Sequence, residues 1–323
     1  MLTGCAPPGT ATAPTPGKGF EVLGSLQLNK LPGAAAVGDG SLWVIDYAEG
    51  SISRIDARTN RLGATVPVGD PRSLPPGCGP GTVHDAPYGS FLVRGCDLPS
   101  AVTVAAGSLW IARNDVRVVE RMDPRSLKVT ATIPTGVRVL GMAGNDSAIW
   151  LAAYEDDTVL RIDPAVNRVN LTVHLIHGPA AFAISARSLW VSRTRGALVT
   201  KLDPQAGLST VDATTDGRPF PMAIAAGSVW VRNEQTSTVT RINEVTGLVQ
   251  ATIQVDPFYG SDGFDSIAVI NGKVWISGLN LEEVDPATNR VRTLPITGRP
   301  LAAGDGTLWV IGIAGAITRI RVS

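Results

Sequence analysis

Apolar and polar residues alternate along short runs that recur through the chain. Runs such as SISRID (51–56), TVLRID (158–163) and TVTRIN (238–243) give an extended strand one apolar and one polar face. Before each comes a run with a tryptophan between apolar residues, as in SLWV (41–44), and before that a run of small apolar residues, as in AFAISA (181–186). Runs like ATIPTG (131–136) follow. Each repeat therefore predicts four short β-strands.

The tryptophans count these repeats. Successive tryptophans are 67, 40, 40, 40, 45 and 34 residues apart, and a period near 40 in one phase is typical of a radial array of small sheets. The last repeat stops after its third strand, whereas GFEVLGSLQLN (19–29) precedes the first repeat as a lone fourth strand. Pairing 20–28 with the last sheet would close the ring and remove a free edge. The sequence predicts an all-β fold: a seven-bladed β-propeller of four-stranded antiparallel blades, closed by the N-terminal strand.

Turn residues recur between the third and fourth strands, as in IDPAVNRV (162–169) and VDPATNRV (284–291). An acidic residue followed by proline suits the first two positions of a type I turn. We therefore predict that the repeated aspartates form turns and are not a carboxylate cluster. They are Asp56, Asp123, Asp163, Asp203 and Asp285. The tryptophans are expected to pack between neighbouring blades.

Composition argues against some classes of binding partner. Lys plus Arg and Asp plus Glu both number 28, and no basic run or aromatic-basic stripe occurs, which argues against nucleic acid and anionic membranes as partners. The apolar stretches are far shorter than the roughly 20 residues that span a bilayer. We expect a monomer whose partner is a small molecule, a glycan or a protein.

The N-terminal residues resemble a lipid attachment site. Leu2-Thr3-Gly4-Cys5 fits the bacterial lipobox, in which the cysteine accepts lipid, and the Pro-, Thr- and Ala-rich residues after it read as a flexible tether. A secretory signal places an apolar stretch before such a box, and only Met1 precedes this one. The alternative is a chance match. We interpret residues 1–18 as lipobox and tether, residues 19–323 as the propeller, and the protein as an extracytoplasmic lipoprotein.

The 67-residue spacing marks an insertion at residues 70–99, between the first two repeats. It contains the two other cysteines, Cys78 and Cys96. A disulfide between them would close a loop of about 18 residues and stabilise the fold by on the order of 3 kcal/mol. Two free buried thiols are the alternative. The insertion itself is either functional or a stapled decoration.

The repeats resemble the YVTN/NHL-type propellers of bacteria, on their IDPATNRV-like and GSLWV motifs and over residues 19–323. The virginiamycin B lyase-like propellers are seven-bladed relatives, and that resemblance implies a metal-assisted elimination that uses His and Glu residues of one face. Their Glu-x-His arrangement does not occur in this sequence, and no histidine follows His177. No residue role is carried over.

The residues after each tryptophan run differ from repeat to repeat. Propeller ligands usually meet the face that carries these positions and the blade-to-blade crossings, and a mixture of arginines, carboxylates and tyrosines suits a polar or anionic ligand. Solvated loop charges are the alternative. The candidate ligand-binding residues are Asp46, Tyr47, His84, Arg113, Asp115, Tyr154, Glu155, Arg193, Arg232, Asn233 and Tyr259.

Evidence for catalysis is sparse. Asp156-Asp157 and the segment DPFYGSDGFD (256–265) offer oxygen ligands for calcium or magnesium, but without EF-hand spacing. Residues 172–177 read as a strand, in which His174 and His177 would point to opposite faces and share no zinc ion. No catalytic residue or bound metal is predicted. The favoured function is non-enzymatic binding on the loop face. The alternative is a metal-dependent lyase or lactonase of the virginiamycin B lyase-like type.

Overall fold

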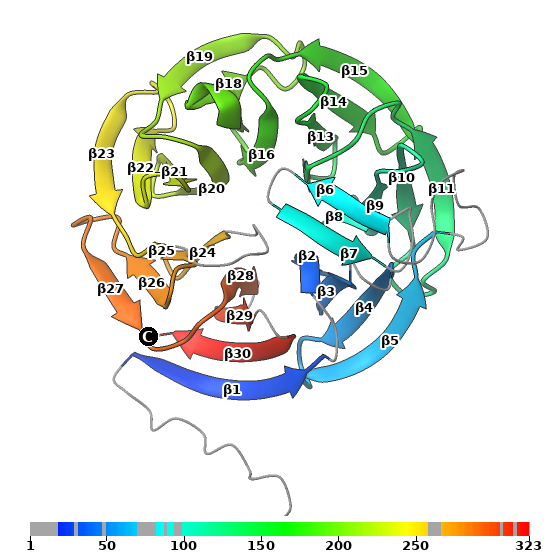
Figure 1. The fold of residues 1–323 in the computed structure, drawn as a ribbon, viewed down its shortest axis with the longest axis horizontal. Coiled ribbons are helices and arrows are strands. Elements are labelled where there is room, and N and C mark those ends of the chain that lie inside the picture. The colour runs from blue at the N-terminus through cyan, green and yellow to red at the C-terminus, as the bar shows by residue number, and fades with distance from the viewer. Residues whose placement is uncertain are drawn as a thin grey trace, which may run out of the picture.

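The computed structural model describes residues 19–28, 32–46, 50–69, 82–86, 89–93, 99–257, 266–303, 306–312 and 315–322. Within these residues the strands form seven four-stranded sheets and one separate hairpin. Figure 1 shows the seven sheets as blades around a ring. The predicted seven-bladed propeller is therefore confirmed.

In each of blades 1 to 6 the four strands follow one another in chain order. Blade 1 is β2 (Pro32–Gly38), β3 (Ser41–Asp46), β4 (Ser51–Asp56) and β5 (Arg61–Pro67). Blade 2 is β8 (Pro99–Ala105), β9 (Ser108–Arg113), β10 (Val118–Met122) and β11 (Val129–Pro134). Blade 3 is β12 (Gly141–Gly144), β13 (Ile149–Ala153), β14 (Thr158–Asp163) and β15 (Arg168–His174).

Blade 4 is β16 (Pro179–Ile184), β17 (Leu189–Arg193), β18 (Leu198–Leu202) and β19 (Ser209–Thr214), with the 3₁₀ turn η1 (Thr194–Gly196) before β18. Blade 5 is β20 (Pro219–Ala225), β21 (Ser228–Asn233), β22 (Thr238–Asn243) and β23 (Val249–Gln254). Blade 6 is β24 (Ile267–Ile270), β25 (Lys273–Ile276), β26 (Leu281–Val284) and β27 (Val291–Leu294). The hairpin is β6 (Thr82–Ala86) and β7 (Gly89–Val93). Because β15 ends at His174, the expected strand over 172–177 is three residues too long.

Blade 7 is built from both ends of the propeller. Its strands are β28 (Arg299–Ala303), β29 (Thr307–Ile311), β30 (Ala316–Val322) and, outermost, β1 (Phe20–Gln27). β1 pairs antiparallel with β30 from Phe20 opposite Val322 to Gln27 opposite Ala316. The predicted closure by the N-terminal strand is confirmed, and β30 is left with no free edge.

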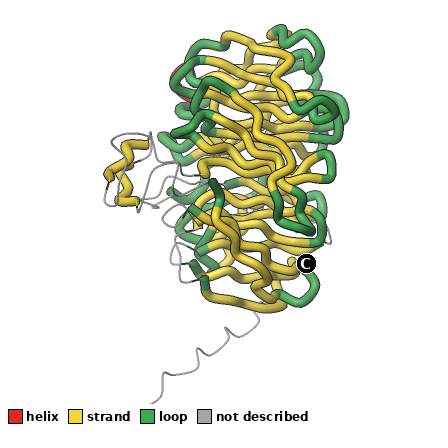
Figure 2. Tube along the Cα trace, turned by 90° about the vertical axis from the view of Figure 1, so that its right-hand side faces the viewer, coloured by secondary structure: helices red, strands yellow, loops and turns green. Residues whose placement is uncertain are grey.

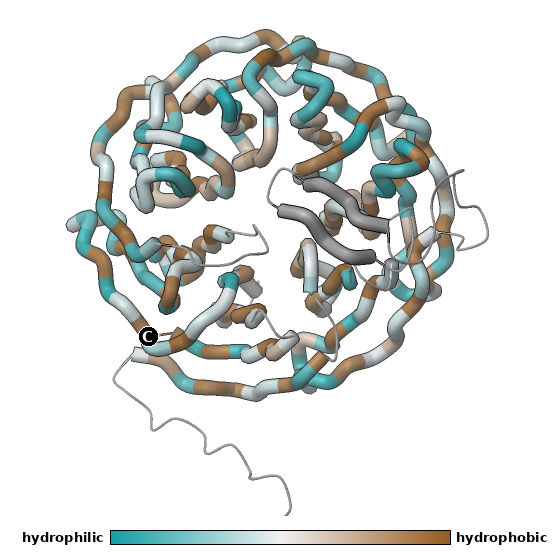
Figure 3. The backbone as a smooth tube through the Cα atoms, in the orientation of Figure 1, coloured by the Kyte–Doolittle hydropathy of each residue, from teal (hydrophilic) through white to brown (hydrophobic). Residues whose placement is uncertain are grey.

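The core consists of apolar clusters between neighbouring blades. All seven tryptophans are at most 1% exposed. Trp110 of blade 2, for example, packs with Ile149 and Leu151 of blade 3. The outermost strands alternate hydrophobic and hydrophilic residues in Figure 3 because only one of their faces lies against a neighbour. The tryptophans therefore hold the blades together, as predicted.

The repeated turn aspartates act as predicted. Asp56 Oδ1 accepts hydrogen bonds from the backbone N–H groups of Arg58 (3.0 Å) and Thr59 (2.7 Å). These bonds and one from the Thr59 hydroxyl lower the pKa of Asp56, chiefly through the Thr59 N–H. Asp123, Asp163, Asp203 and Asp285 accept equivalent bonds within their own turns.

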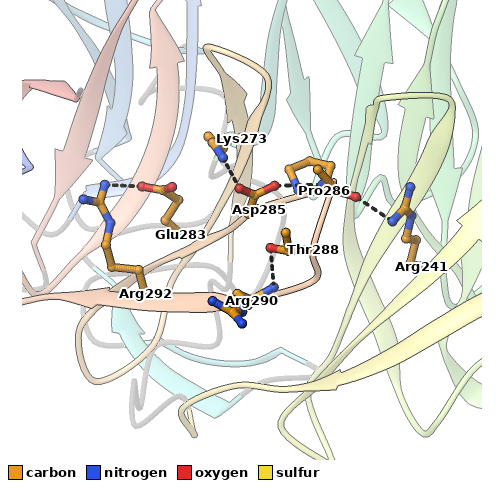
Figure 4. A network of polar contacts seen from close by, with 9 residues as sticks. Arg241, Lys273, Glu283, Asp285, Pro286, Thr288, Arg290 and Arg292 are labelled. Carbon is orange, nitrogen blue, oxygen red and sulfur yellow. Dashed lines mark hydrogen bonds and ion pairs between the residues drawn. The ribbon is translucent and has the colours of Figure 1, made fainter.

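The turn asparagines also join adjacent blades. Arg241 of blade 5 stacks on Trp230, 5.0 Å from its ring, and its Nη1 donates to Pro286 O (2.7 Å) and Asn289 Oδ1 (3.0 Å) in the turn of blade 6. Asn289 has a φ of 58°, in the left-handed region that asparagine tolerates. We call this arrangement the arginine clamp; Figure 4 shows its contact at Pro286. It recurs from Arg121 to Asn167 and from Arg319 to Asn60.

Blade 6 lacks the basic residue that the other blades carry opposite the tryptophan. Opposite its tryptophan stands Glu283, which pairs with Arg292 of the next strand in Figure 4. The other six blades carry an arginine or lysine there. In an arginine clamp, the arginine bonds the third-to-fourth-strand turn of the next blade. Blade 7 has no such turn, because its outer strand β1 comes from the other end of the chain, so an arginine at 283 would have no turn to bind.

Candidate functional site on the loop face

Strand direction places two sets of connections on one face of the ring. The second-to-third-strand loops and the fourth-to-first-strand crossings share this face, because successive strands of a blade run in opposite directions. We call it the loop face and the opposite side the turn face. The β6–β7 hairpin belongs to the crossing between blades 1 and 2. It stands off one side of the disc in Figure 2 and lies in front of the ring in Figure 1.

Arg113 ends the second strand of blade 2 and is buried toward blade 1. Its Nη1 pairs with Glu120 Oε1, and both side chains are almost wholly covered. Oε2 of Glu120 has no hydrogen-bond partner among the described residues. Burying a charge is costly unless the charge is paired, so this ion pair joins the end of β9 to the middle of β10.

Arg193 occupies the same position in blade 4 and is also buried. Its Nε donates to Ile176 O in the crossing from blade 3 (2.8 Å), and its Nη1 donates to Thr200 Oγ1 (3.2 Å). Nη1 also reaches Asp212 Oδ2 at 3.3 Å. The guanidinium group thus ties blade 4 to the crossing that precedes it.

Blade 5 contributes two consecutive buried residues. Nδ2 of Asn233 donates to the hydroxyls of Thr238 (3.0 Å) and Thr240 (2.8 Å) within the blade. Arg232 is 0% exposed and points to the other side of the strand, toward blade 6, where its Nη2 donates to Asp256 O (2.8 Å).

Glu282 of blade 6 binds the same backbone unit from the opposite side. Its Oε2 accepts a hydrogen bond from Asp256 N (2.9 Å), and the residue is 2% exposed. Burial raises the pKa of Glu282, and the nearby Asp256 carboxylate adds to the rise, more than the Asp256 N–H bond and the Arg232 charge lower it. Arg232 and Glu282 therefore hold both polar backbone groups of Asp256 where the crossing to blade 6 begins.

A partly exposed cluster lies on the loops of blades 3 and 4. The Arg195 guanidinium stacks on Tyr154, 4.8 Å from the ring centre, donates to Tyr154 O (3.1 Å) and pairs with Asp157 Oδ1 (2.5 Å). Gly178 N donates to the same oxygen (2.8 Å). A Cβ on Gly178 would lie 2.6 Å from the Tyr154 ring, so only glycine allows this packing. We call Tyr154, Asp157, Gly178 and Arg195 the Tyr154 cluster.

Asp157 is held in its ionised form by this cluster. Partial burial would raise the pKa of Asp157, but hydrogen bonds from Gly178 N and Arg195, together with the Arg195 charge, outweigh burial and lower it. His177 is exposed nearby and its backbone oxygen accepts from Arg195 N (3.0 Å). The cluster presents an aromatic ring, a guanidinium group and a carboxylate in fixed positions at the surface.

The other predicted residues are placed as follows. Asp46 is buried at the end of β3, Asp115 pairs with Arg138 (3.4 Å), and Glu155 is exposed beside Tyr154. His84 lies in β6. Outside the described residues lie Tyr47, Tyr259, Cys5, Cys78 and Cys96. Five of the predicted ligand residues therefore stand buried in strand ends and not in loops: Asp46, Arg113, Arg193, Arg232 and Asn233.

Sequence reasoning missed Glu120 and Glu282, although a signal was present. Both stand opposite the residue that follows the tryptophan, where other blades carry Ser53, Leu160 or Thr200. A glutamate at this position, buried between blades, needs a positive partner. Aligning the third strands on the tryptophans would have exposed both residues.

The described residues contain no group of three or more His, Cys, Asp or Glu side chains placed to hold a metal ion. They also contain no helix long and apolar enough to cross a membrane.

Comparisons with known proteins support the fold alone. No family model matches the chain, and no curated protein matches it. The structure is similar to Kuenenia stuttgartiensis hydrazine synthase, with a TM-score of 0.68 and 14% sequence identity over 92% of this chain and 97% of that chain. Because 1489 chains of solved structures match, the fold does not single out a function.

Proposed function

We propose that this protein is a non-enzymatic binding module that holds a polar small molecule, a glycan or a protein segment on its loop face. The Tyr154 cluster carries the proposal. Its ring and guanidinium group are fixed by Asp157 and Gly178 before any ligand arrives, so little side-chain entropy is lost on binding. A guanidinium group held on an aromatic ring suits polar and anionic groups.

Buried hydrogen bonds hold the backbone of the same loop face in place. Arg193 ties the crossing at Ile176 to blade 4, directly before Gly178 of the cluster. A binding site is held to its geometry when the residues that carry it are themselves fixed by packing and hydrogen bonds. The loop face of blades 3 and 4 therefore has the rigid support that a binding site needs.

The lipobox-like LTGC and the Pro- and Thr-rich tether support an extracytoplasmic, lipid-anchored location for this module. The repeat motifs support kinship with the YVTN/NHL-type propellers. Mass spectrometry of the protein from a bacterial membrane fraction tests the anchor, since lipid on Cys5 adds a defined mass.

A thermal-shift screen of sugars, carboxylic acids and secreted metabolites, followed by calorimetry, tests the binding proposal. We expect Tyr154→Ala with Arg195→Ala to weaken any ligand found by roughly tenfold or more, since two fixed contacts are lost. Arg125→Ala with Arg168→Ala on the turn face is the matched control and should leave affinity unchanged. Equal affinity of the wild type and of the variant with Tyr154→Ala and Arg195→Ala would show that the Tyr154 cluster is not the binding site. Turnover that EDTA abolishes and calcium or magnesium restores would instead support the lyase-like alternative.

A further inference from the structure

Exposed apolar side chains gather on the turn face. Among the described residues, seven of the ten exposed large hydrophobic residues lie in the third-to-fourth-strand turns or at the start of the fourth strands. These seven are Leu62, Val129, Val166, Leu208, Val245, Leu248 and Val249. Scattered surface hydrophobics need no explanation, but a concentration on one rim indicates a contact surface.

The most exposed of these residues are adjacent around the ring. Leu208 of blade 4 is 66% exposed, and Val245 and Leu248 of blade 5 are 71% and 69% exposed. The turns that carry them pack against the preceding blade: a Cβ on Gly247 would lie 2.1 Å from Val211 of blade 4. Because each turn is fixed in this way, its apolar side chains stay directed to solvent.

Basic residues share the rim. Exposed arginines and lysines stand in or beside the third-to-fourth-strand turns of blades 1, 2, 3 and 6: Arg58, Arg61, Arg125, Lys128, Arg168 and Arg290. The repeated turn aspartates are only partly exposed and use a carboxylate oxygen within the turn, whereas Asp39 and Asp146 of the first-to-second-strand turns are exposed on the same face. No basic run marks this surface in the sequence, because the turns of blades 1, 2, 3 and 6 contribute one or two exposed cations each and those of blades 4 and 5 contribute none. Only the closed ring collects them on one face.

Chain direction places the start of β1 on the same face. Phe20 pairs with Val322, so β1 begins where β30 ends. Figure 2 shows the C-terminal end on the side opposite the hairpin. The first described residues, Gly19 and Phe20, therefore lie at the turn face.

We propose that the turn face rests on an anionic lipid bilayer, through its exposed apolar turns and basic residues. Apolar side chains with arginines and lysines beside them suit the interface between headgroups and acyl chains. This orientation directs the loop face, with the Tyr154 cluster and the hairpin, away from the membrane. It goes beyond the proposed binding function and does not depend on the identity of that ligand.

Vesicle binding tests the proposal. The full chain carrying Cys5→Ser, which cannot be lipidated, is sedimented with vesicles of phosphatidylglycerol and phosphatidylcholine and with vesicles of phosphatidylcholine alone. We expect binding to the anionic vesicles, weakened by high salt, and roughly tenfold weaker binding for Leu208→Glu with Leu248→Glu.

The matched control places the same change on the opposite face. Ile176 and Leu279 are 48% and 46% exposed on the loop face, so Ile176→Glu with Leu279→Glu should keep wild-type vesicle binding. The proposal would be overturned if the Cys5→Ser chain did not bind the anionic vesicles, or if the turn-face and loop-face double variants lost vesicle binding equally. Unchanged melting temperatures show that both pairs remain folded. Ligand affinity at the loop face should be unaffected by the turn-face pair, so the two proposals can fail separately.

Discussion

At the scale of single residues, close approach between backbones sets the strictest demands. A Cβ on Gly141 would lie 1.9 Å from Ala180 O, where the innermost strands of blades 3 and 4 pass each other. A backbone oxygen cannot move aside as a side chain can. Glycine at 141 is therefore required by the spacing of the blades and not by an unusual φ angle.

Gly141→Ala should accordingly lower the free energy of unfolding by about 1–3 kcal/mol, the usual cost of overpacking. Gly63→Ala is the control, because its Cβ would meet only Arg54 O, at 3.4 Å. Urea denaturation followed by tryptophan fluorescence measures both. Equal stability of the two variants would contradict the close approach.

A second residue-scale prediction concerns pH. Asp157 has a lowered pKa in the folded protein, so its ionised form stabilises the fold above the unfolded pKa near 3.8, and this contribution is lost as pH falls through the folded pKa. Asp157→Asn should cost about 0.5–1 kcal/mol at pH 7, since the pair with Arg195 is partly exposed. Melting temperatures should differ at pH 7 and converge as the pH falls below 3.8. Asp156→Asn, at an exposed neighbour, should have little effect at any pH.

At the scale of elements, polar contacts between blades add specificity to the apolar clusters. The arginine clamp combines a stack on one blade with hydrogen bonds to the next, and it needs asparagine at the left-handed position of the turn. Blade 4 has Gly207 there, and Nε of Arg161 in blade 3 has no hydrogen-bond partner among the described residues. The choice between asparagine and glycine thus decides where a clamp forms.

Arg241→Met should therefore destabilise the protein more than Arg161→Met, by about 1–2 kcal/mol, because only Arg241 bonds the next blade. Both substitutions keep an apolar stem against the tryptophan. Thermal unfolding of the two variants measures the difference, and Asn289→Gly should reduce it. A larger loss from Arg161→Met would contradict the clamp.

The pair Arg232 and Glu282 calls for a double-mutant cycle. Arg232→Met removes the donor to Asp256 O and the positive charge near buried Glu282, and should cost about 1–3 kcal/mol. The double variant with Glu282→Gln should recover much of that loss. Additive losses would show that the two side chains act independently.

At the scale of the whole molecule, closure makes the ring cooperative. The outer strand of blade 7 comes from the N-terminal end of the propeller, and Arg299 adds a second tie by donating to Pro32 O and Gly33 O of blade 1. Removing residues 19–28 would expose the whole edge of β30. The stability of every blade is coupled to this seam, because each blade buries its core only against its neighbours.

We expect deletion of residues 2–28 to abolish cooperative unfolding and to promote aggregation, whereas deletion of residues 2–18 should leave the melting temperature unchanged. Size-exclusion chromatography and calorimetry distinguish the two. A folded monomer after the longer deletion would show that the ring does not need β1.

The sequence alone determined the blade count, the strand order, the closing strand and the turn aspartates. These follow from local periodicity and turn chemistry, which repeat from blade to blade and can be recognised without knowing the tertiary contacts. The five polar residues at the strand ends could not be placed in the same way. Arg232 resembled a loop charge in the sequence, yet it is fully buried. Its burial depends on Glu282 and Asp256, which another blade supplies. The gathering of exposed leucines, valines and arginines on one face likewise exists only after the ring closes, because each blade contributes too few residues to form a surface.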